Sequence, residues 1–509
     1  MISIDWNYLI INYYYYYLLI IFIIFIVLIV YNWKFLVEPF KKIRKKTWIL
    51  LILIFLFGFS LRMWYVPHTF RVFADEYVHL DIVNNMFLEQ KACDCRNSMN
   101  LVSCVNCTVP PWPPVAHFIL SIATTLSEKV SFLLIVSTIF ASCSIILVFS
   151  LFFLIFKNEK LALFSSLFLS CFPVHLKFSG TLALENYSFF FITLSFILFF
   201  SYVHQRKNTI FFAFFISLLL TIQIKLENVF IFLVFLFAYI LLFYEKKNLN
   251  KLFVVFLVLF VLLIPHYQLI KHNSLSSRTS FGWMHSFNKF STNLFFNICQ
   301  NTTFFFKSYI LFFSVLSLIG LFRLFHHDRT LFFVFVFFFA CFFFIYSAHN
   351  FGSFQYGNAD RYFLNFSISF MVFFVSGMDF LFKNIKSKLF SFLFVAIIIF
   401  ILFLPWIYKI DIYKMQIFSE EFLFLSNMNI SHDCVFFSNE HYRLRTLRYD
   451  NVFYIDLKFN DSFYDKINNS CKIVYDSSIF YKDKNLYDFD YEQFDINSYR
   501  KLFQLNPIM

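Results

Sequence analysis

The chain has 509 residues, of which 60% are hydrophobic and only 14% are charged. A typical soluble domain is about half apolar and a quarter charged, so this composition excludes an ordinary soluble globular protein. The formal net charge of +12 does not indicate a nucleic-acid partner, because the basic residues form short clusters between long apolar runs, as in the loops of membrane proteins.

Long apolar runs mark candidate membrane spans, because a helix needs about 20 apolar residues to cross a hydrocarbon core roughly 30 Å thick. The first run is too long for a signal-peptide core and no small-residue cleavage site follows it, so we interpret it as a retained anchor. Its tyrosine run, Tyr13–Tyr17, receives no functional weight, because a codon bias would enrich Tyr together with Phe, Ile, Asn and Lys. We predict about twelve spans, at residues 8–31, 48–66, 130–156, 161–175, 187–203, 209–224, 228–244, 252–266, 306–325, 330–347, 363–382 and 389–407.

Clusters of Lys and Arg predict the orientation of these spans. If the basic loop at residues 41–46 is cytoplasmic, alternation of the spans places every later basic cluster on the same side, as the positive-inside rule requires. The loops 67–129, 267–305 and 348–362 then lie on the other side, together with the polar tail that begins at about residue 410. We therefore expect a multi-pass plasma-membrane protein whose first outer loop and C-terminal region are extracytoplasmic.

The polar tail differs in composition from the rest of the chain. Its apolar stretches predict short strands at Cys434–Ser438, Val452–Asp456 and Cys471–Tyr475, and its mixed stretches predict helices at Glu440–Arg448 and Ser462–Ile467. The fold class that we predict is an all-α polytopic membrane protein of about twelve transmembrane helices with a small C-terminal α/β domain.

The first outer loop opens with adjacent carboxylates, Asp75 and Glu76, directly after the second predicted span. Carboxylates at a membrane boundary are costly unless they are paired, bound to metal or used in chemistry. One use is to accept a proton from a hydroxyl as it attacks a sugar carbon. The alternative is a solvated loop with ordinary acids.

The same loop contains the segment Val109–His117, in which four prolines flank Trp112. Proline fixes φ and cannot continue a helix, so the segment predicts a rigid elbow. The apolar stretch that follows, up to Leu126, is too short to span and predicts a helix that lies at the interface or re-enters it. The alternative is a plain connector.

Two later segments place single charges beside predicted spans on the same outer side. Glu185 precedes the fifth span, and Arg361 opens the eleventh within the sequence Ala359-Asp360-Arg361-Tyr362. A guanidinium at the lipid boundary can bind two phosphate oxygens at once, although it could also be an interfacial snorkelling arginine. Lys225 and Glu227 lie between two short spans, where they could pair with each other or add positive charge near a phosphate.

In their order and spacing, the Asp-Glu loop opening, the Pro-Pro elbow and the Arg-Tyr segment resemble the membrane-embedded GT-C glycosyltransferases. The similarity is to the protein O-mannosyltransferase branch and to the aminoarabinose transferase and RgtA/B/C/D-like branch, and it covers about residues 48–410. Those enzymes use polyprenyl-phosphate sugars as donors. The chain departs from them in its extra first span and in Asn365, which stands where Leu-Pro is often found. It lacks a Trp-Trp-Asp signature, which disfavours transfer of a whole oligosaccharide.

The resemblance implies a division of roles among these residues. Asp75 takes the place of the catalytic base with Glu76 beside it, and Arg361 that of the donor-phosphate ligand. The other candidates for substrate binding are Tyr77, His79, Glu185, Lys225 and Tyr362. We expect no required cofactor and assign no metal site; a divalent cation is compatible with the chemistry but not supported by the sequence. The expected partners are the polyprenyl-phosphate sugar, the lipid bilayer and a lipid, glycan or protein acceptor, with no nucleic acid.

Four cysteines in the first outer loop, Cys93, Cys95, Cys104 and Cys107, have two interpretations. They can form two disulfides, as expected in an oxidising compartment, or a four-thiolate zinc site. The outer location favours disulfides.

We thus predict three regions and one activity. Residues 1–47 hold an extra transmembrane helix and a basic cytoplasmic loop, residues 48–409 a GT-C-like catalytic domain with the outer loop 67–129, and residues 410–509 an extracytoplasmic α/β domain. The predicted activity is inverting transfer of a hexosyl or pentosyl group from the lipid-linked donor to a hydroxyl. The alternatives are a transporter or flippase of lipid-linked glycans and a non-catalytic scaffold, and a scaffold would leave the charged residues more than about 15 Å apart.

Overall fold

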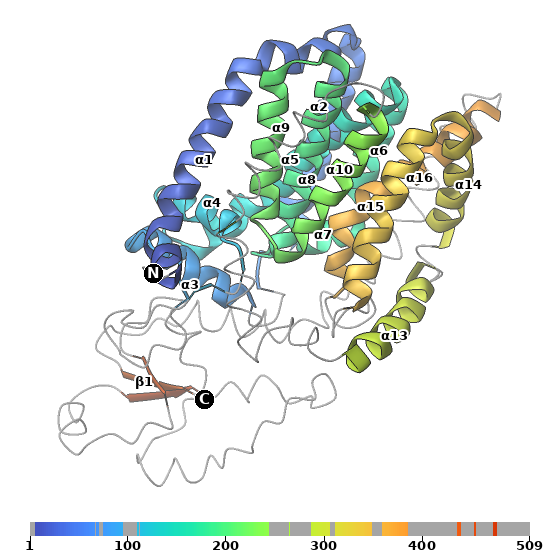
Figure 1. The fold of residues 1–509 in the computed structure, drawn as a ribbon. Helices are drawn as coiled ribbons and strands as arrows, with labels where there is room; N and C mark the ends of the chain where they lie inside the picture. Colours follow the sequence, from blue (N-terminus) through green and yellow to red (C-terminus); the bar gives the residue numbers. More distant parts are fainter. Residues whose placement is uncertain are drawn as a thin grey trace, which may run out of the picture. The chain divides into compact units, whose positions relative to one another are not determined.

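The computed structural model describes residues 6–66, 68–70, 75–94, 109–110, 112–243, 264, 287–305, 311–348 and 359–384, and three short strands beyond them. The chain divides into two compact units, residues 1–94 with 108–413 and residues 95–107 with 414–509. The described helices belong to the first unit and the strands to the second (Figure 1).

The first unit is a bundle of apolar helices. They are α1 (Trp6–Val37), α2 (Lys45–Ser60), α3 (Asp75–Leu88), α4 (Val115–Thr124), α5 (Val130–Phe156), α6 (Glu159–Cys171), α7 (Pro173–Phe178), α8 (Leu184–Gln205), α9 (Asn208–Ile222), α10 (Val229–Phe243), α13 (Phe287–Phe305), α14 (Leu311–His327), α15 (Arg329–Ala348) and α16 (Phe363–Asn384). Short helical turns adjoin them at Glu38–Lys42, Leu61–Tyr65, Leu226–Asn228 and Ala359–Tyr362.

Seven of the described helices are long and apolar enough to cross a membrane: α1, α2, α5, α8, α10, α15 and α16, some with their adjoining turns. Shorter apolar helices are formed by α4, α9 and most of α14. Ten of the twelve predicted spans coincide with helices, whereas the spans at 252–266 and 389–407 fall almost wholly outside the described residues. The chain is therefore an all-α polytopic membrane protein, as predicted.

Two helices lie where the sequence predicted outer loops. The helix α3 begins at Asp75, so its two adjacent acids occupy the first helical turn, where the helix dipole favours negative charge. The helix α13 lies in the predicted outer segment 267–305 and mixes Asn and Thr with Phe, which explains why hydropathy alone did not reveal it. The predicted helix at the interface is present as α4, which follows the proline elbow directly.

A fully buried arginine ties α2 to the neighbouring α6. Arg62 donates to the carbonyl oxygens of Gly58 (2.8 Å), Leu169 (3.0 Å) and Ser170 (3.2 Å), and its Nη2 lies 2.9 Å from Nδ1 of His175. Two of these carbonyls belong to the last turn of α6, where the helix dipole favours a cation. The contact explains how a charged side chain is accommodated inside an apolar bundle.

Close packing of α14 against α16 depends on two glycines. A Cβ atom on Gly320 would lie 1.7 Å from the carbonyl oxygen of Phe373, and one on Gly377 would lie 2.1 Å from that of Leu316. Real Cβ atoms do not approach an oxygen so closely, so only glycine permits this separation of the two helices.

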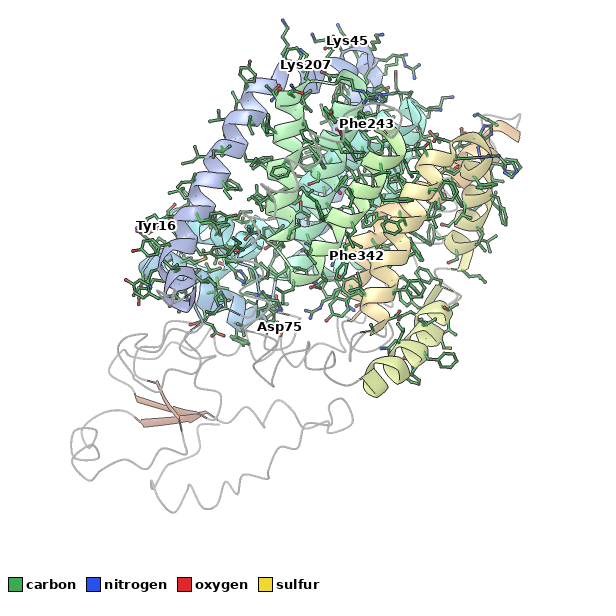
Figure 2. All side chains as sticks on the ribbon, viewed as in Figure 1. Tyr16, Lys45, Asp75, Lys207, Phe243 and Phe342 are labelled. Atoms are coloured by element: carbon green, nitrogen blue, oxygen red, sulfur yellow. The ribbon has the colours of Figure 1, made fainter. Side chains whose placement is uncertain are left out.

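Two lysines of the basic turns and the first acid of α3 lie at opposite ends of the bundle. Lys45 and Lys207 lie at one end and Asp75 at the other (Figure 2). The side of the membrane that each end faces stays a prediction from the positive-inside rule.

The second unit contains a three-stranded parallel sheet in the order β2-β1-β3, formed by β1 (Val435–Ser438), β2 (Val452–Tyr454) and β3 (Lys472–Tyr475). Phe436 pairs with Val452 on one side and Ile473 on the other. Each strand falls within a predicted one. The predicted tail helices lie outside the described residues.

Candidate functional site

The candidate site is built from helix ends that meet at one end of the bundle. Asp75 begins α3, Glu185 lies in the first turn of α8, and Arg361 belongs to the helical turn before α16. Lys225 lies in the connection between α9 and the turn Leu226–Asn228, which also carries Glu227. Polar residues gather there because a helix end leaves backbone groups unpaired and places side chains at the boundary of the apolar region.

Arg361 joins two acids that are far apart in the sequence. Its Nη2 donates to Oδ2 of Asp75 at 3.0 Å across a separation of 286 residues, and its Nε lies 3.4 Å from Oε1 of Glu185. The second contact is an ion pair without the alignment of a hydrogen bond, since Nε lacks a hydrogen-bond partner within the described part of the chain. The side chain of Arg361 is 12% exposed and that of Asp75 is 31% exposed, so Asp75 is the more accessible partner.

Lys225 extends the network on the other side of Glu185. Its Nζ lies 2.9 Å from Oε1 of Glu185 and 2.7 Å from Oε1 of Glu227. Burial lowers the pKa of Lys225, but the charges of Glu185 and Glu227 outweigh this effect and hold the pKa well above its usual value. Lys225 is therefore a buried cation, and its pairing with Glu227 is the one that the sequence suggested.

We use the name charged cluster for Asp75, Glu185, Lys225, Glu227 and Arg361. Its members are linked by contacts of 3.4 Å or less, so they do not show the wide separation expected of a scaffold. Three carboxylates meet two cations in it. Such a network is stable at an apolar boundary only while each charge keeps its partners.

Two stacked tyrosines cover one side of the charged cluster. The rings of Tyr346 and Tyr362 are 4.8 Å apart and nearly parallel. Nζ of Lys225 lies 4.9 Å from the Tyr362 ring centre, and the guanidinium of Arg361 lies 5.2 Å from it. A cation at this distance from an aromatic face is attracted to the ring, so Tyr362 helps to hold both cations in place.

Glu76 has a different environment from its neighbour Asp75. It is fully buried, and its Oε1 accepts a hydrogen bond of 2.8 Å from the backbone N–H of Leu182, in the segment that leads into α8. Nearby, the N–H of Thr69 donates to the carbonyl of Gly180 at 3.2 Å. Glu76 therefore connects the start of α3 to the segment that precedes Glu185, and Asp75 is left facing Arg361.

The remaining substrate-binding candidates of the first outer loop are buried. Tyr77 is fully buried and packs edge-on against Phe70, with ring centres 4.9 Å apart. His79 lies one helical turn after Asp75, with its Nδ1 2.9 Å from Nε2 of His117 and its ring 4.7 Å from that of Trp112. The proline elbow and α4 thus pack against α3, and these contacts support its position.

Several polar residues of the site carried no signal in the sequence. Lys177 of α7 forms an ion pair of 2.8 Å with Asp360, the neighbour of Arg361. The amide of Asn365 donates to the hydroxyl of Tyr346, which in turn donates to Oε1 of Glu227 at 3.3 Å. Asn365 departs from the Leu-Pro of the resembling family, and its amide provides a contact that proline cannot make.

The cysteine interpretations are tested at one position. Cys93 is disulfide-bonded, in agreement with the disulfide interpretation. Cys95, Cys104 and Cys107 lie outside the described residues. Within the described part of the chain, no group of three or more His, Cys, Asp or Glu side chains is arranged to hold a metal ion.

Comparison with known proteins identifies the fold of this bundle. No protein-family profile and no curated protein matches the chain. The crystal structure of the apo oligosaccharyltransferase of Archaeoglobus fulgidus matches with a TM-score of 0.51 and 12% identity over 81% of this chain and 64% of that one. The same protein in complex with Zn and sulfate matches with a TM-score of 0.51 and 11% identity over 79% of this chain and 62% of that one.

At this level of identity the similarity concerns the fold. The chain spans about 64% of the length of that oligosaccharyltransferase. The transmembrane unit of this protein has a GT-C-like fold.

Proposed function

We propose that this protein is a membrane-embedded glycosyltransferase that moves a sugar from a polyprenyl-phosphate donor to a hydroxyl acceptor. The observation that carries the proposal is the meeting of Asp75 with Arg361 at one end of a GT-C-like bundle. In such a reaction the acceptor hydroxyl loses a proton, its oxygen forms a bond to the anomeric carbon, and the bond from that carbon to the donor phosphate breaks.

Asp75 is the group best placed to accept the proton. It is the most exposed carboxylate of the charged cluster, and it begins a helix instead of lying within one. A base must reach the acceptor hydroxyl within about 3 Å, which a buried carboxylate such as Glu185 cannot do without rearrangement.

Arg361 is the group best placed to hold the donor phosphate. Its planar guanidinium can donate two parallel hydrogen bonds to phosphate oxygens, a geometry that lysine lacks. It lies in the helical turn directly before α16, within the candidate span Asp360–Lys383, so a lipid-linked phosphate can reach it along the bilayer. Glu185 and Lys225 act behind it by fixing the position of the guanidinium.

Asp75 and Arg361 neutralise each other in the charged cluster. The donor phosphate must therefore replace Asp75 as a partner of Arg361, and this replacement releases Asp75 for the acceptor. Binding of the donor and exposure of the base are thereby one event, which disfavours proton transfer before a donor is present.

The test is transfer from defined lipid-linked donors by purified protein in lipid nanodiscs. We expect transfer from a polyprenyl-phosphate monosaccharide in the wild type, less than about 1% of that rate in Asp75→Asn, and full activity in Glu89→Gln. Glu89 is a suitable control because it lies just after α3 and pairs at the surface with Lys91. Transfer from a lipid-linked oligosaccharide instead would identify en bloc transfer, and full activity of Asp75→Asn would remove Asp75 as the base.

A further inference from the structure

The N-terminal helix α1 precedes the part of the chain that resembles GT-C enzymes. Its run Tyr13–Tyr17 received no functional weight in the sequence, because codon bias alone could produce it. The structure divides that run by helical periodicity. Tyr13 and Tyr16 are 54% and 45% exposed, whereas Tyr14 is 2% exposed. Figure 1 shows α1 beside α9 at the edge of the bundle.

Tyr14 is bound to a buried glutamine at that end. Its hydroxyl donates to Oε1 of Gln223, and Nε2 of Gln223 donates to the hydroxyl of Tyr17 at 3.3 Å. The rings of Tyr14 and Tyr17 are stacked with centres 5.5 Å apart. Gln223 is 1% exposed, so both of its side-chain amide atoms are satisfied by the hydroxyls of α1.

Gln223 also joins two elements of the candidate site. Its backbone carbonyl oxygen accepts a hydrogen bond of 3.0 Å from the backbone N–H of Val115, the first residue of α4. Two residues after Gln223 comes Lys225, the buried cation between Glu185 and Glu227. A single residue therefore connects α1 to the start of α4 and to the turn that carries Lys225.

A second contact ties α1 to the segment after α3. The N–H of Ala92 donates to the carbonyl of Ile11 at 2.9 Å, and the ring of Tyr15 packs edge-on against that of Phe118 in α4, with centres 5.2 Å apart. The helix α1 thus contacts the segment that follows α3, and it also contacts α4. Both of these lie between Asp75 and Lys225 in the sequence.

We propose that Gln223, held by Tyr14, is a positioning residue that sets the turn of Lys225 and, through Glu185, the guanidinium of Arg361. The transmembrane helix α1 then helps to set the geometry of the charged cluster. This inference rests on the proposed function for its effect on donor binding, but its structural consequence is measurable without any ligand.

The test compares Tyr14→Phe with Tyr13→Phe, an exposed tyrosine of the same helix. Hydrogen exchange of intact protein in nanodiscs is measured at residues 113–118 and 222–228. We expect faster exchange than in the wild type at both segments in Tyr14→Phe and in Gln223→Met, and no increase in exchange in Tyr13→Phe. The thermal midpoint of each variant should stay within about 2 °C of that of the wild type. Equal exchange in Tyr14→Phe and Tyr13→Phe would overturn the positioning role.

Binding of polyprenyl phosphate provides the second readout. Loss of one buried hydrogen bond predicts binding about fivefold weaker in Tyr14→Phe, with little further loss in the double variant with Gln223→Met because both remove the same contact. Weakening equal to that of Tyr13→Phe would also overturn the proposal. If exchange changes as expected but wild-type protein neither binds polyprenyl phosphate nor transfers sugar, the proposed function fails and the positioning of the Lys225 turn stands.

Discussion

Replacing Asp75 by Asn should strengthen donor binding while it abolishes transfer. The hydrogen bond of 3.0 Å between Arg361 and Asp75 joins two charged groups, and such bonds contribute about 1.5–3 kcal/mol. Because Asp75 is 31% exposed, solvent screens the pair and the lower half of that range applies. In Asp75→Asn, a donor phosphate no longer displaces a carboxylate, so we expect its affinity to rise about 13- to 45-fold.

The assay measures binding of polyprenyl phosphate to purified protein in neutral-lipid nanodiscs, at low and at high salt. Asp75→Asn should bind tightly without turnover, Glu89→Gln should bind as the wild type does, and Arg361→Met should bind weakly. Added salt should weaken binding of polyprenyl phosphate in the wild type, in Glu89→Gln and in Asp75→Asn, because the contact with Arg361 is ionic. Unchanged or weaker binding by Asp75→Asn would refute the reasoning, since Asp75 would then not compete with phosphate for Arg361.

Three further variants test the surrounding structure. Glu76→Gln should keep the transfer rate within a few-fold of the wild type, because its amide oxygen still accepts a hydrogen bond from Leu182. Glu76→Leu loses this bond and should lower the free energy of unfolding by about 1–3 kcal/mol. Transfer rates and denaturation in detergent distinguish the two variants. Gly320→Val should force α14 and α16 apart at Phe373, lower the thermal midpoint and lower the free energy of unfolding by about 1–3 kcal/mol or more. The control is Leu318→Val, at an exposed, lipid-facing position of the same helix. Arg62→Met should cost more than about 3 kcal/mol because several charge-assisted hydrogen bonds are lost together, and Arg62→Lys should recover part of this in the same denaturation experiment.

Hydropathy predicted most of the membrane helices because lipid imposes one requirement along a whole span, namely apolar side chains around a hydrogen-bonded helix. The same reasoning failed for α3 (Asp75–Leu88). Its buried faces include His79, Asp81 and Asn85, which make the segment look like a polar loop. Those residues are tolerated inside because α3 packs against α4 and the elbow, and such tertiary contacts leave no trace in local periodicity.

Charge made part of the candidate site visible in the sequence. Asp75, Glu185 and Arg361 stood out because ionisable groups are scarce and costly in an apolar chain. Tyr346 could not be singled out among 29 tyrosines, nor Gln223 at the end of an ordinary span, because a neutral polar group acquires meaning only through its partner.

The charged cluster differs from the other described ion pairs of the bundle in the number of carboxylates that it joins. Lys177 pairs with Asp360 and Arg44 pairs with Glu159, while Asp379 pairs with both Arg323 and Lys383, so each of these links contains a single acid. A structural link needs no more than that, because each additional buried charge costs desolvation. The charged cluster instead sets three carboxylates against two cations. Among these five residues, uptake of one proton by a carboxylate makes the numbers of negative and positive charges equal, which favours a carboxylate of the cluster as the base.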